Sequence, residues 1–449
     1  MALNTASRRL SVCPPVTSMT MTTSVAATSG ATRRCHSSPA PSTSKAAVSR
    51  KAAAKTTVEF PTFLRPRLDE LRTNIIDQLA GRDRIPAFMR LRQAAMTSSS
   101  SSPSASSFPT MEQMARLYFE RGGKLFRPTI AMLMASACNQ EVVARGGRVA
   151  VAAADEDISS RQASIALIAE MIHVASLVHD DVIDEADTRR GAPSVSGCWG
   201  NKMAVLAGDF ILARATQALC AIGDPTVIST MATIIEDLVV GEFLQMSPEL
   251  SPSSSSSTTV SPFSPSSSTV SSPSTTVSSS STSFTDRLSL YLAKSERKTA
   301  SLFANSCRSV AMLADGADGD LQTRAAEYGR HVGLAFQLVD DAIDYELEDD
   351  SEGESAGKPI AVDLEQGLIT GPLLLSANSD AELAALLRPD VSAAEVREAV
   401  RRSGACERTR ALATQHAQHA ADIACSLRST NGASEALADL ALRQLERRS

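Results

Sequence analysis

The chain has 449 residues, of which 21% are charged, and its formal net charge at pH 7 is −6. This length allows one large domain or two smaller ones. Beyond an N-terminal basic segment the chain is acidic, so we expect no nucleic-acid partner. No stretch approaches the roughly 18 uninterrupted apolar residues of a membrane span, so we expect no transmembrane helix.

The N-terminal segment, residues 1–58, has the composition of an organelle transit peptide. It contains no Asp or Glu, carries eight basic residues, and is rich in Ser and Thr. It lacks the long apolar core of a secretory signal. The alternative interpretation is a disordered basic tail, and in either case the segment is left out of the fold prediction.

The rest of the chain reads as helices. In residues 59–80, apolar residues such as Leu64, Leu68, Leu71 and Ile75 recur at three-four spacing. Similar patterns predict helices over 111–138, 164–184, 202–222, 226–246, 286–313 and 321–345, followed by three C-terminal segments. Runs that alternate with period two are missing. We therefore predict an all-α fold, a large single-domain helical bundle over 59–449, with disordered Ser-rich insertions at 97–107 and 247–283.

Two of these predicted helices end on the same acidic motif, DDxxD. Its carboxylates are Asp180, Asp181 and Asp184 in the first copy, and Asp340, Asp341 and Asp344 in the second. At about 100° per residue, three such side chains share one helix face and repel one another unless cations lie between them. Mg²⁺ suits oxygen ligands and usually shares its coordination shell with substrate phosphates. The duplication favours a metal-binding cleft over two solvated helix ends, and the spacing of an EF-hand is absent.

Cationic residues near these motifs could bind phosphate. In the segment GGKLFRP (122–128), Lys124 and Arg127 lie one helical turn apart, and arginine offers a planar fork that matches phosphate. Further cationic residues near the motifs are Arg189, Arg190, Lys294, Lys298 and Lys358, while Thr299 follows Lys298 and Gln337 lies one turn before Asp340. Six carboxylates and at least six cations fit an ionic, metal-bridged pair of substrates better than a protein partner.

Together these stretches resemble the trans-isoprenyl diphosphate synthases, and within them the mitochondrial long-chain polyprenyl (solanesyl or decaprenyl) diphosphate synthases. The matching segments are GGKLFRP, IALIAEMIHVASLVHDDVIDEADTRRG, KMAVLAGDFILARA, IIEDLVVGEFLQM, KTASLFANSCRSVAML, YGRHVGLAFQLVDDAIDY and GKPIAVDLEQGLITGP. The resemblance covers nearly all of residues 59–449 outside the Ser-rich insertions. It implies a bundle of the isoprenoid synthase type with a central catalytic cavity. The implied reaction is Mg²⁺-dependent head-to-tail condensation of isopentenyl diphosphate onto an allylic diphosphate, which makes the ubiquinone side chain.

The resemblance also implies a role for each site residue. All six motif carboxylates would ligate Mg²⁺. Isopentenyl diphosphate would be held by Lys124, Arg127, His173 and Arg190, and the allylic diphosphate by Arg189, Lys298, Thr299, Gln337 and Lys358. Ala175 and Ser176, slightly more than one turn before the first motif, would set product length, and their small size would leave the product tunnel open. The chain departs from the family at Ser295, where Thr is usual, at Leu368, where short-chain relatives have a second Lys, and in an acidic loop at 348–356.

Other interpretations stay open. A class I terpene cyclase would normally lack the second motif and the GGKxxRP pair. A metal phosphohydrolase built on His179 and Asp180 would need further histidines. A non-catalytic or partner-dependent subunit of a heteromeric synthase would typically have one degraded acidic motif, whereas both are intact here.

The remaining expectations concern location, assembly and minor residues. We expect a mitochondrial protein, with the plastid as the alternative, that forms a homodimer or hetero-oligomer and contacts the membrane only peripherally, for product release. The eight cysteines show no CxxC spacing and are interpreted as small buried residues in a reducing compartment. His416 and His419 are interpreted as surface residues rather than as a metal site.

Overall fold

A computed structural model of the protein describes residues 61–80, 110–121, 125–147, 157–189, 191–246, 284–346, 369–377, 379–388 and 390–447. All of them belong to one compact unit, Thr57–Ser449. The segments 1–58, 97–107 and 247–283 lie outside the described residues, and so do Lys124, Arg190 and Lys358.

The described residues are almost entirely helical, which confirms the all-α class. The first half contains α1 (Leu64–Ala80), α3 (Met111–Glu120), α4 (Phe126–Ala144), α5 (Ser160–Ile183), the strands β1 (Thr188–Arg189) and β2 (Ala192–Pro193), α6 (Val195–Trp199), α7 (Asn201–Ile222) and α8 (Pro225–Gln245). The second half contains α9 (Phe284–Ser295), the π-helical turn η2 (Glu296–Ala300), α10 (Ser301–Met312), α11 (Gly319–Glu346), α13 (Gly371–Ser376), α14 (Asp380–Leu386), α15 (Ala393–Arg402), α16 (Ala405–Cys425), α17 (Ala433–Arg443) and the 3₁₀ turn η3 (Gln444–Glu446).

Three sequence predictions need correction. The helix predicted over 111–138 is two helices, because α3 ends at Glu120 and α4 starts at Phe126, next to Leu125 with φ of 46°. The apolar spacing runs through both helices and hides the break, although the adjacent glycine pair signals it. In place of three C-terminal segments there are five described α-helices, of which α13 and α14 are too short for a clear periodic pattern. The two-residue strands of the β1–β2 hairpin were not predicted.

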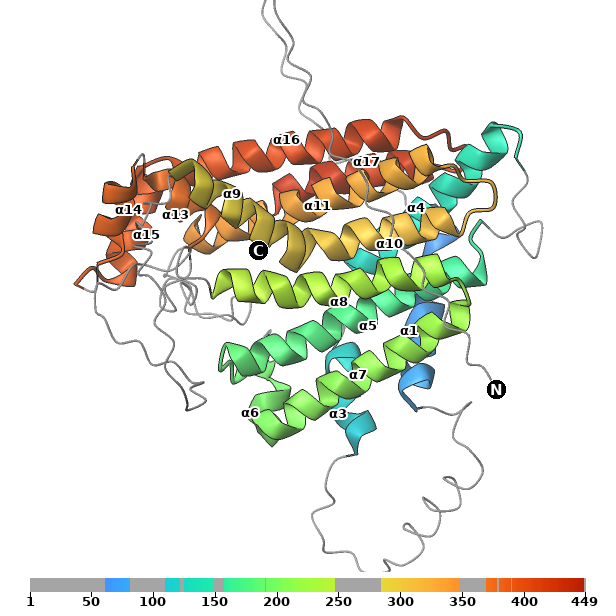
Figure 1. Cartoon of the computed structure of the whole chain (residues 1–449), viewed down its shortest axis with the longest axis horizontal. Coiled ribbons are helices and arrows are strands. Elements are labelled where there is room, and N and C mark those ends of the chain that lie inside the picture. The colour runs from blue at the N-terminus through green and yellow to red at the C-terminus, as the bar shows by residue number, and fades with distance from the viewer. Residues whose placement is uncertain are drawn as a thin grey trace, which may run out of the picture. The chain divides into compact units, whose positions relative to one another are not determined.

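The long helices pack side by side (Figure 1). Side-chain caps mark where several of them begin. Ser159 and Gln162 form a capping box at the start of α5, and Asp224 caps α8 with Pro225 in its first turn. Helix α5 packs against α4 and α7, while α11 packs against α10 and α16. These contacts bring the C-terminal ends of α5 and α11, and therefore both acidic motifs, into the same bundle.

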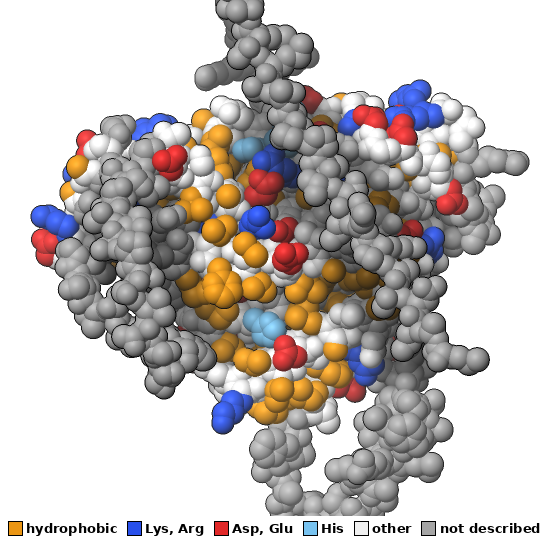
Figure 2. Space-filling model, viewed as in Figure 1, with side chains coloured by type: hydrophobic (Ala, Val, Ile, Leu, Met, Phe, Trp, Pro, Cys, Tyr) orange, Lys and Arg blue, Asp and Glu red, His pale blue; other side chains and the backbone are white. Residues whose placement is uncertain are grey.

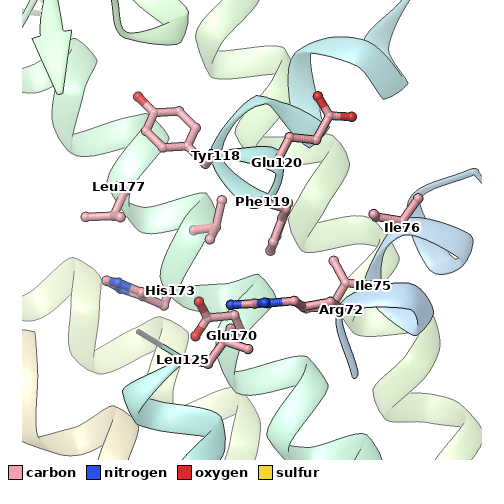
Figure 3. A pocket seen from close by; sticks show the side chains of 11 residues that line it. Arg72, Ile75, Ile76, Tyr118, Phe119, Glu120, Leu125, Glu170, His173 and Leu177 are labelled. Atoms are coloured by element: carbon pink, nitrogen blue, oxygen red, sulfur yellow. The ribbon is translucent and has the colours of Figure 1, made fainter. Parts of the chain in front are cut away.

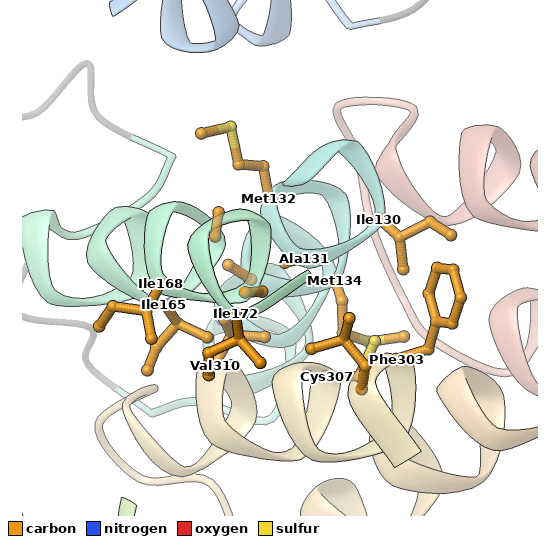
Figure 4. Packing of buried hydrophobic residues seen from close by; sticks show 14 of the residues in the cluster. Ile130, Ala131, Met132, Met134, Ile165, Ile168, Ile172, Phe303, Cys307 and Val310 are labelled. Atoms are coloured by element: carbon orange, nitrogen blue, oxygen red, sulfur yellow. The ribbon is translucent and has the colours of Figure 1, made fainter. Parts of the chain in front are cut away.

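The core lies where α4, α5 and α10 meet (Figure 4). Met134 of α4, Ile168 of α5 and Val310 of α10 are all completely buried there. A truncation such as Ile168→Ala at such a position typically costs about 2–5 kcal/mol of unfolding free energy. Leu321, Ala325 and Val332 of α11 belong to the same buried cluster, so this core anchors both acidic helices.

Among the described helices, α5 and α7 are long and apolar enough to cross a membrane on length and composition alone. The apolar 18-residue window of α5 is 56% buried inside the fold, and the corresponding window of α7 is 33% buried. Core helices of large bundles pass the same test, so this observation is weak support for a membrane span.

Candidate active site

The first acidic motif occupies the last turn of α5 and the turn that follows. The backbone N–H of Asp184, the C-cap residue, donates to the carbonyl oxygen of Asp180 over 2.8 Å, and Glu185 then takes φ of 50°. The β1–β2 hairpin turns the chain back, so that Nε and Nη2 of Arg189 both lie 2.6 Å from Oδ1 of Asp181. The Tyr118 hydroxyl of α3 donates to Oδ2 of the same carboxylate, which is completely buried.

The second motif lies near the end of α11 and is built in a similar way. The carboxylate of Asp341, only 4% exposed, accepts hydrogen bonds from the Tyr291 hydroxyl at 2.6 Å, from Gln337 Nε2 at 2.7 Å and from the Gly371 N–H at 3.1 Å. Gln337 in turn accepts a 2.6 Å hydrogen bond from the hydroxyl of Thr299. This polar chain connects α9, η2, α11 and α13 behind the motif.

The structure therefore separates the six motif carboxylates into two kinds. The middle ones, Asp181 and Asp341, are buried, whereas the first and last of each motif are partly exposed. Residues i and i+4 share a helix face and residue i+1 is rotated away by about 100°, so packing can bury one carboxylate and leave the other two at the rim.

The π-helical turn η2 links the two motifs. A Cβ on Gly241 of α8 would lie 2.9 Å from the Lys298 backbone nitrogen, so glycine allows α8 and η2 to approach closely. Lys298 Nζ lies 2.5 Å from Glu242 and 3.2 Å from Gln245 Oε1, while its neighbour Thr299 contacts Gln337 on α11. Such turns are frequent at functional sites, because the extra residue redirects side chains.

The charges at the first motif perturb one another. Burial raises the pKa of Asp180 to about 6, with Glu242 adding to the rise and Lys298 opposing it. Burial opposes the charge of Lys298, but Asp180 and Glu242 outweigh it and raise the pKa of the ammonium group. Asp180 is thus held where added positive charge would be favourable, as perturbed carboxylates in functional clefts often are.

Arg127 of the GGKLFRP segment lies near the second motif. Its guanidinium sits over the rings of Phe303, at 5.1 Å, and Phe336, at 5.8 Å. Burial raises the pKa of Asp340 to about 6, while Arg447 and Arg127 oppose the rise. Arg447, which sequence reasoning missed, contacts Asp340 at 2.8 Å. As the third-last residue of the sequence, it gave no signal of this contact.

A cavity of about 270 Å³ begins at the first motif, with Asp180 and Lys298 on its wall. The rest of its lining is mostly apolar, and Ile172, Leu212 and Leu238 contribute to it. Ser176 lines this cavity, whereas Ala175 is completely buried and does not. On the face of the molecule drawn in Figure 2, exposed apolar side chains surround acidic and basic ones.

A second cavity, of about 240 Å³, lies between α1, α3 and α5 (Figure 3). His173, Glu170 and Arg72 line it together with Leu125, which directly follows the predicted Lys124. His173, predicted to bind isopentenyl diphosphate, is therefore at a cavity wall and not closed inside the core.

The donor set suits a metal that completes its shell with substrate and water oxygens. Within the described ranges, no three His, Cys, Asp or Glu side chains already form a group that could hold a metal ion. The partly exposed carboxylates are Asp180, Asp184, Asp340 and Asp344. Mg²⁺ is commonly bound through one or two carboxylates plus phosphates, so these residues fit Mg²⁺.

Sequence reasoning also missed Glu242, Tyr118 and Tyr291. Two signals were available in the sequence. Glu242 follows a glycine in the segment IIEDLVVGEFLQM, and Tyr118 lies four residues before the glycine pair. Two minor interpretations change as well. His419 is exposed as predicted, but His416 is only partly exposed, and its Nδ1 lies 2.7 Å from Nδ1 of His331. Of the six cysteines in the described ranges, all free, Cys198, Cys220 and Cys425 are exposed rather than buried.

Comparison with known proteins identifies the family of the chain. Residues 108–402 match the family model described as Polyprenyl synthetase. The chain therefore belongs to the polyprenyl synthetase family.

Individual relatives of the chain are polyprenyl diphosphate synthases. The chain is 40% identical over 316 residues to the all trans-polyprenyl-diphosphate synthase PDSS1 of Homo sapiens, an alignment that covers 69% of this chain and 64% of that protein. It is 39% identical to solanesyl-diphosphate synthase 1, mitochondrial, of Oryza sativa subsp. japonica, with 70% of this chain and 66% of the relative covered. The chain thus spans slightly less than two thirds of these relatives.

Among solved structures, the fold is similar to that of a polyprenyl synthase from Caulobacter crescentus CB15, complexed with calcium and isoprenyl diphosphate. The TM-score is 0.61 and the sequence identity 25%, with 86% of this chain and 96% of that chain covered.

Proposed function

We propose that the protein is a long-chain trans-polyprenyl diphosphate synthase. It would join isopentenyl diphosphate head-to-tail to an allylic diphosphate and so build the side chain of a quinone such as ubiquinone. The observation that carries the proposal is the η2 turn, where Lys298 contacts Glu242 beside Asp180 and Thr299 contacts the polar chain behind Asp341. One short segment thus has a residue beside each acidic motif, which supports a shared site.

Asp180, Asp184, Asp340 and Asp344 are the residues that would hold Mg²⁺. When bound, Mg²⁺ would neutralise the charge of the allylic diphosphate and so favour its departure as pyrophosphate. The Caulobacter relative is complexed with calcium and isoprenyl diphosphate, which supports the binding of a divalent cation and of a diphosphate.

Basic side chains of the chain itself would share this charge. Lys298 and Arg189 stand at the first motif, where they would bind the allylic diphosphate. Arg127, beside Asp340, and His173, at the second cavity, would bind isopentenyl diphosphate. Lys124, Arg190 and Lys358 remain predicted ligands from sequence alone.

The apolar cavity behind Asp180 would take the growing hydrocarbon chain. Its apolar lining, to which Ile172, Leu212 and Leu238 contribute, would exclude water that could otherwise trap the allylic cation. Ser176 is small and lines this cavity, so it would leave room for the growing chain to extend past it.

The direct test is product analysis with the purified full chain. Radiolabelled isopentenyl diphosphate, geranylgeranyl diphosphate and Mg²⁺ should give prenyl diphosphates longer than the primer, and EDTA should abolish the reaction. Incorporation only after addition of a second prenyl synthase chain would indicate a partner-dependent subunit. No incorporation in either case would refute the proposal.

The place of action is proposed as the mitochondrion, with the plastid as the alternative. The basic, acid-free residues 1–58 and the mitochondrial rice relative support it. A fusion of residues 1–60 to a fluorescent protein should enter mitochondria, and a cytosolic fusion would contradict the proposal.

Oligomer formation is proposed from exposed apolar side chains on two neighbouring helices. Val205 and Leu206 of α7 are 41% and 49% exposed, and Val239 and Phe243 of α8 are 52% and 68% exposed. Such a patch marks a surface for a second subunit or for peripheral membrane contact. Light scattering should report at least a dimer, and a monomer that pellets with lipid vesicles would favour membrane contact instead.

A further inference from the structure

The two middle carboxylates, Asp181 and Asp341, are treated alike by the fold. Each is buried, and each accepts a hydrogen bond from a tyrosine that belongs to another helix. Tyr118 comes from α3 and reaches Asp181, while Tyr291 comes from α9 and reaches Asp341 at 2.6 Å. The acidic motif is therefore duplicated together with a tyrosine that holds its second residue.

Each buried carboxylate is fully supplied with donors. Burial of a carboxylate is costly unless hydrogen bonds and charges compensate it. Arg189 supplies two 2.6 Å contacts to Asp181, and Gln337 and the Gly371 N–H supply two contacts to Asp341. A Cβ at residue 371 would lie 2.8 Å from the Tyr291 hydroxyl, so glycine at that position lets both donors reach the same carboxylate.

A fixed middle carboxylate fixes the direction of its neighbours. Because successive helical residues are about 100° apart, the rotation of the helix end that keeps Asp181 buried also sets where Asp180 and Asp184 project. Outer residues that orient metal ligands in this way commonly change metal affinity about 10–100-fold when they are removed.

We propose that Tyr118 and Tyr291 are positioning residues for the divalent-cation sites, acting through Asp181 and Asp341. The inference rests on the proposed function, because it takes the flanking carboxylates as the metal ligands. In this arrangement Asp181 and Asp341 do not bind the metal themselves, and they instead orient the flanking carboxylates that do.

The test compares Tyr118→Phe and Tyr291→Phe with Tyr328→Phe. Tyr328 is a matched control, because it is completely buried on α11 and its hydroxyl donates to the Leu437 carbonyl at 2.8 Å, away from both motifs. Binding of Mn²⁺ in the presence of inorganic pyrophosphate is followed by electron paramagnetic resonance, with thermal unfolding recorded in parallel. Both test variants should bind Mn²⁺ about tenfold more weakly. Tyr328→Phe should bind as the wild type does.

A double variant separates positioning from general damage. If Tyr118 acts through Asp181, adding Tyr118→Phe to Asp181→Asn should weaken Mn²⁺ binding no further. Wild-type Mn²⁺ affinity in both tyrosine variants, additive losses in the double variant, or failure of both tyrosine variants to fold would overturn the proposal. The assay involves no turnover, so a wild-type protein that binds Mn²⁺ with pyrophosphate but makes no prenyl product would refute the proposed function alone.

Discussion

Lys298 and Glu242 form a 2.5 Å ion pair on the wall of the apolar cavity that also includes Asp180. The pair exists because Gly241 lets α8 approach the π-helical turn at the Lys298 backbone. In this arrangement Glu242 balances the lysine charge, and an incoming diphosphate would compete with it for the same ammonium group.

Replacement of Lys298 by methionine should raise the KM for the allylic diphosphate. The substitution keeps most of the side-chain volume and removes one charged hydrogen-bond donor, an interaction of about 1.5–3 kcal/mol, which corresponds to roughly 10–100-fold. Arg297→Met is the matched control, since Arg297 is the adjacent residue and pairs with Asp237 at 2.8 Å. Initial-rate kinetics that gave Lys298→Met a wild-type KM would exclude this role.

A phenylalanine at position 176 should shorten the products, whereas a phenylalanine at position 175 should mainly destabilise the fold. Ser176→Phe places a ring in the cavity and should shift products toward farnesyl or geranylgeranyl diphosphate while condensation continues. Ala175 is completely buried, so Ala175→Phe should instead lower the free energy of unfolding by about 1–3 kcal/mol. Chromatography of the products and urea denaturation separate the two effects. Full-length product from Ser176→Phe would show that the gate lies elsewhere.

Stability should fall in mild acid because of His331. Burial, together with His416, His419 and Arg330, lowers the pKa of His331 from 6.5 to about 4, against a smaller opposing effect of Glu296. Between these two values the unfolded chain binds a proton that the folded chain does not, so the free energy of unfolding decreases as the pH falls.

The variant His331→Gln should reduce this slope. Urea denaturation of both proteins at several pH values between about 7 and 4 measures it. Parallel curves for wild type and variant would show that His331 is not the group responsible.

The sequence predicted the acidic helices well because their apolar spacing is regular. The predicted ranges 164–184 and 321–345 correspond to Ser160–Ile183 and Gly319–Glu346. The burial of Asp181 and Asp341 could not be predicted in this way. Their tyrosine partners lie 63 and 50 residues away along the chain, and a DDxxD pattern does not say which carboxylate faces the interior.

The π-helical turn at Glu296–Ala300 was equally hidden, because one inserted residue hardly disturbs the helical period of 286–313. The close approach of Gly241 to the Lys298 backbone is a tertiary contact, so the sequence pattern does not show it. Tertiary contacts of this kind decide which side chains reach the site.

The central claim is that both acidic motifs serve one condensation reaction. Turnover of isopentenyl diphosphate with a geranylgeranyl primer and Mg²⁺, measured for Asp180→Asn and Asp340→Asn, tests it most directly. Asp320→Asn is the control, because Asp320 lies on α11 in a surface ion pair with Arg324 and its side chain is 67% exposed. We predict that each motif variant loses at least about a hundredfold in turnover, since each removes a ligand for the metal that stabilises the leaving group. Near wild-type turnover in either motif variant would contradict the account.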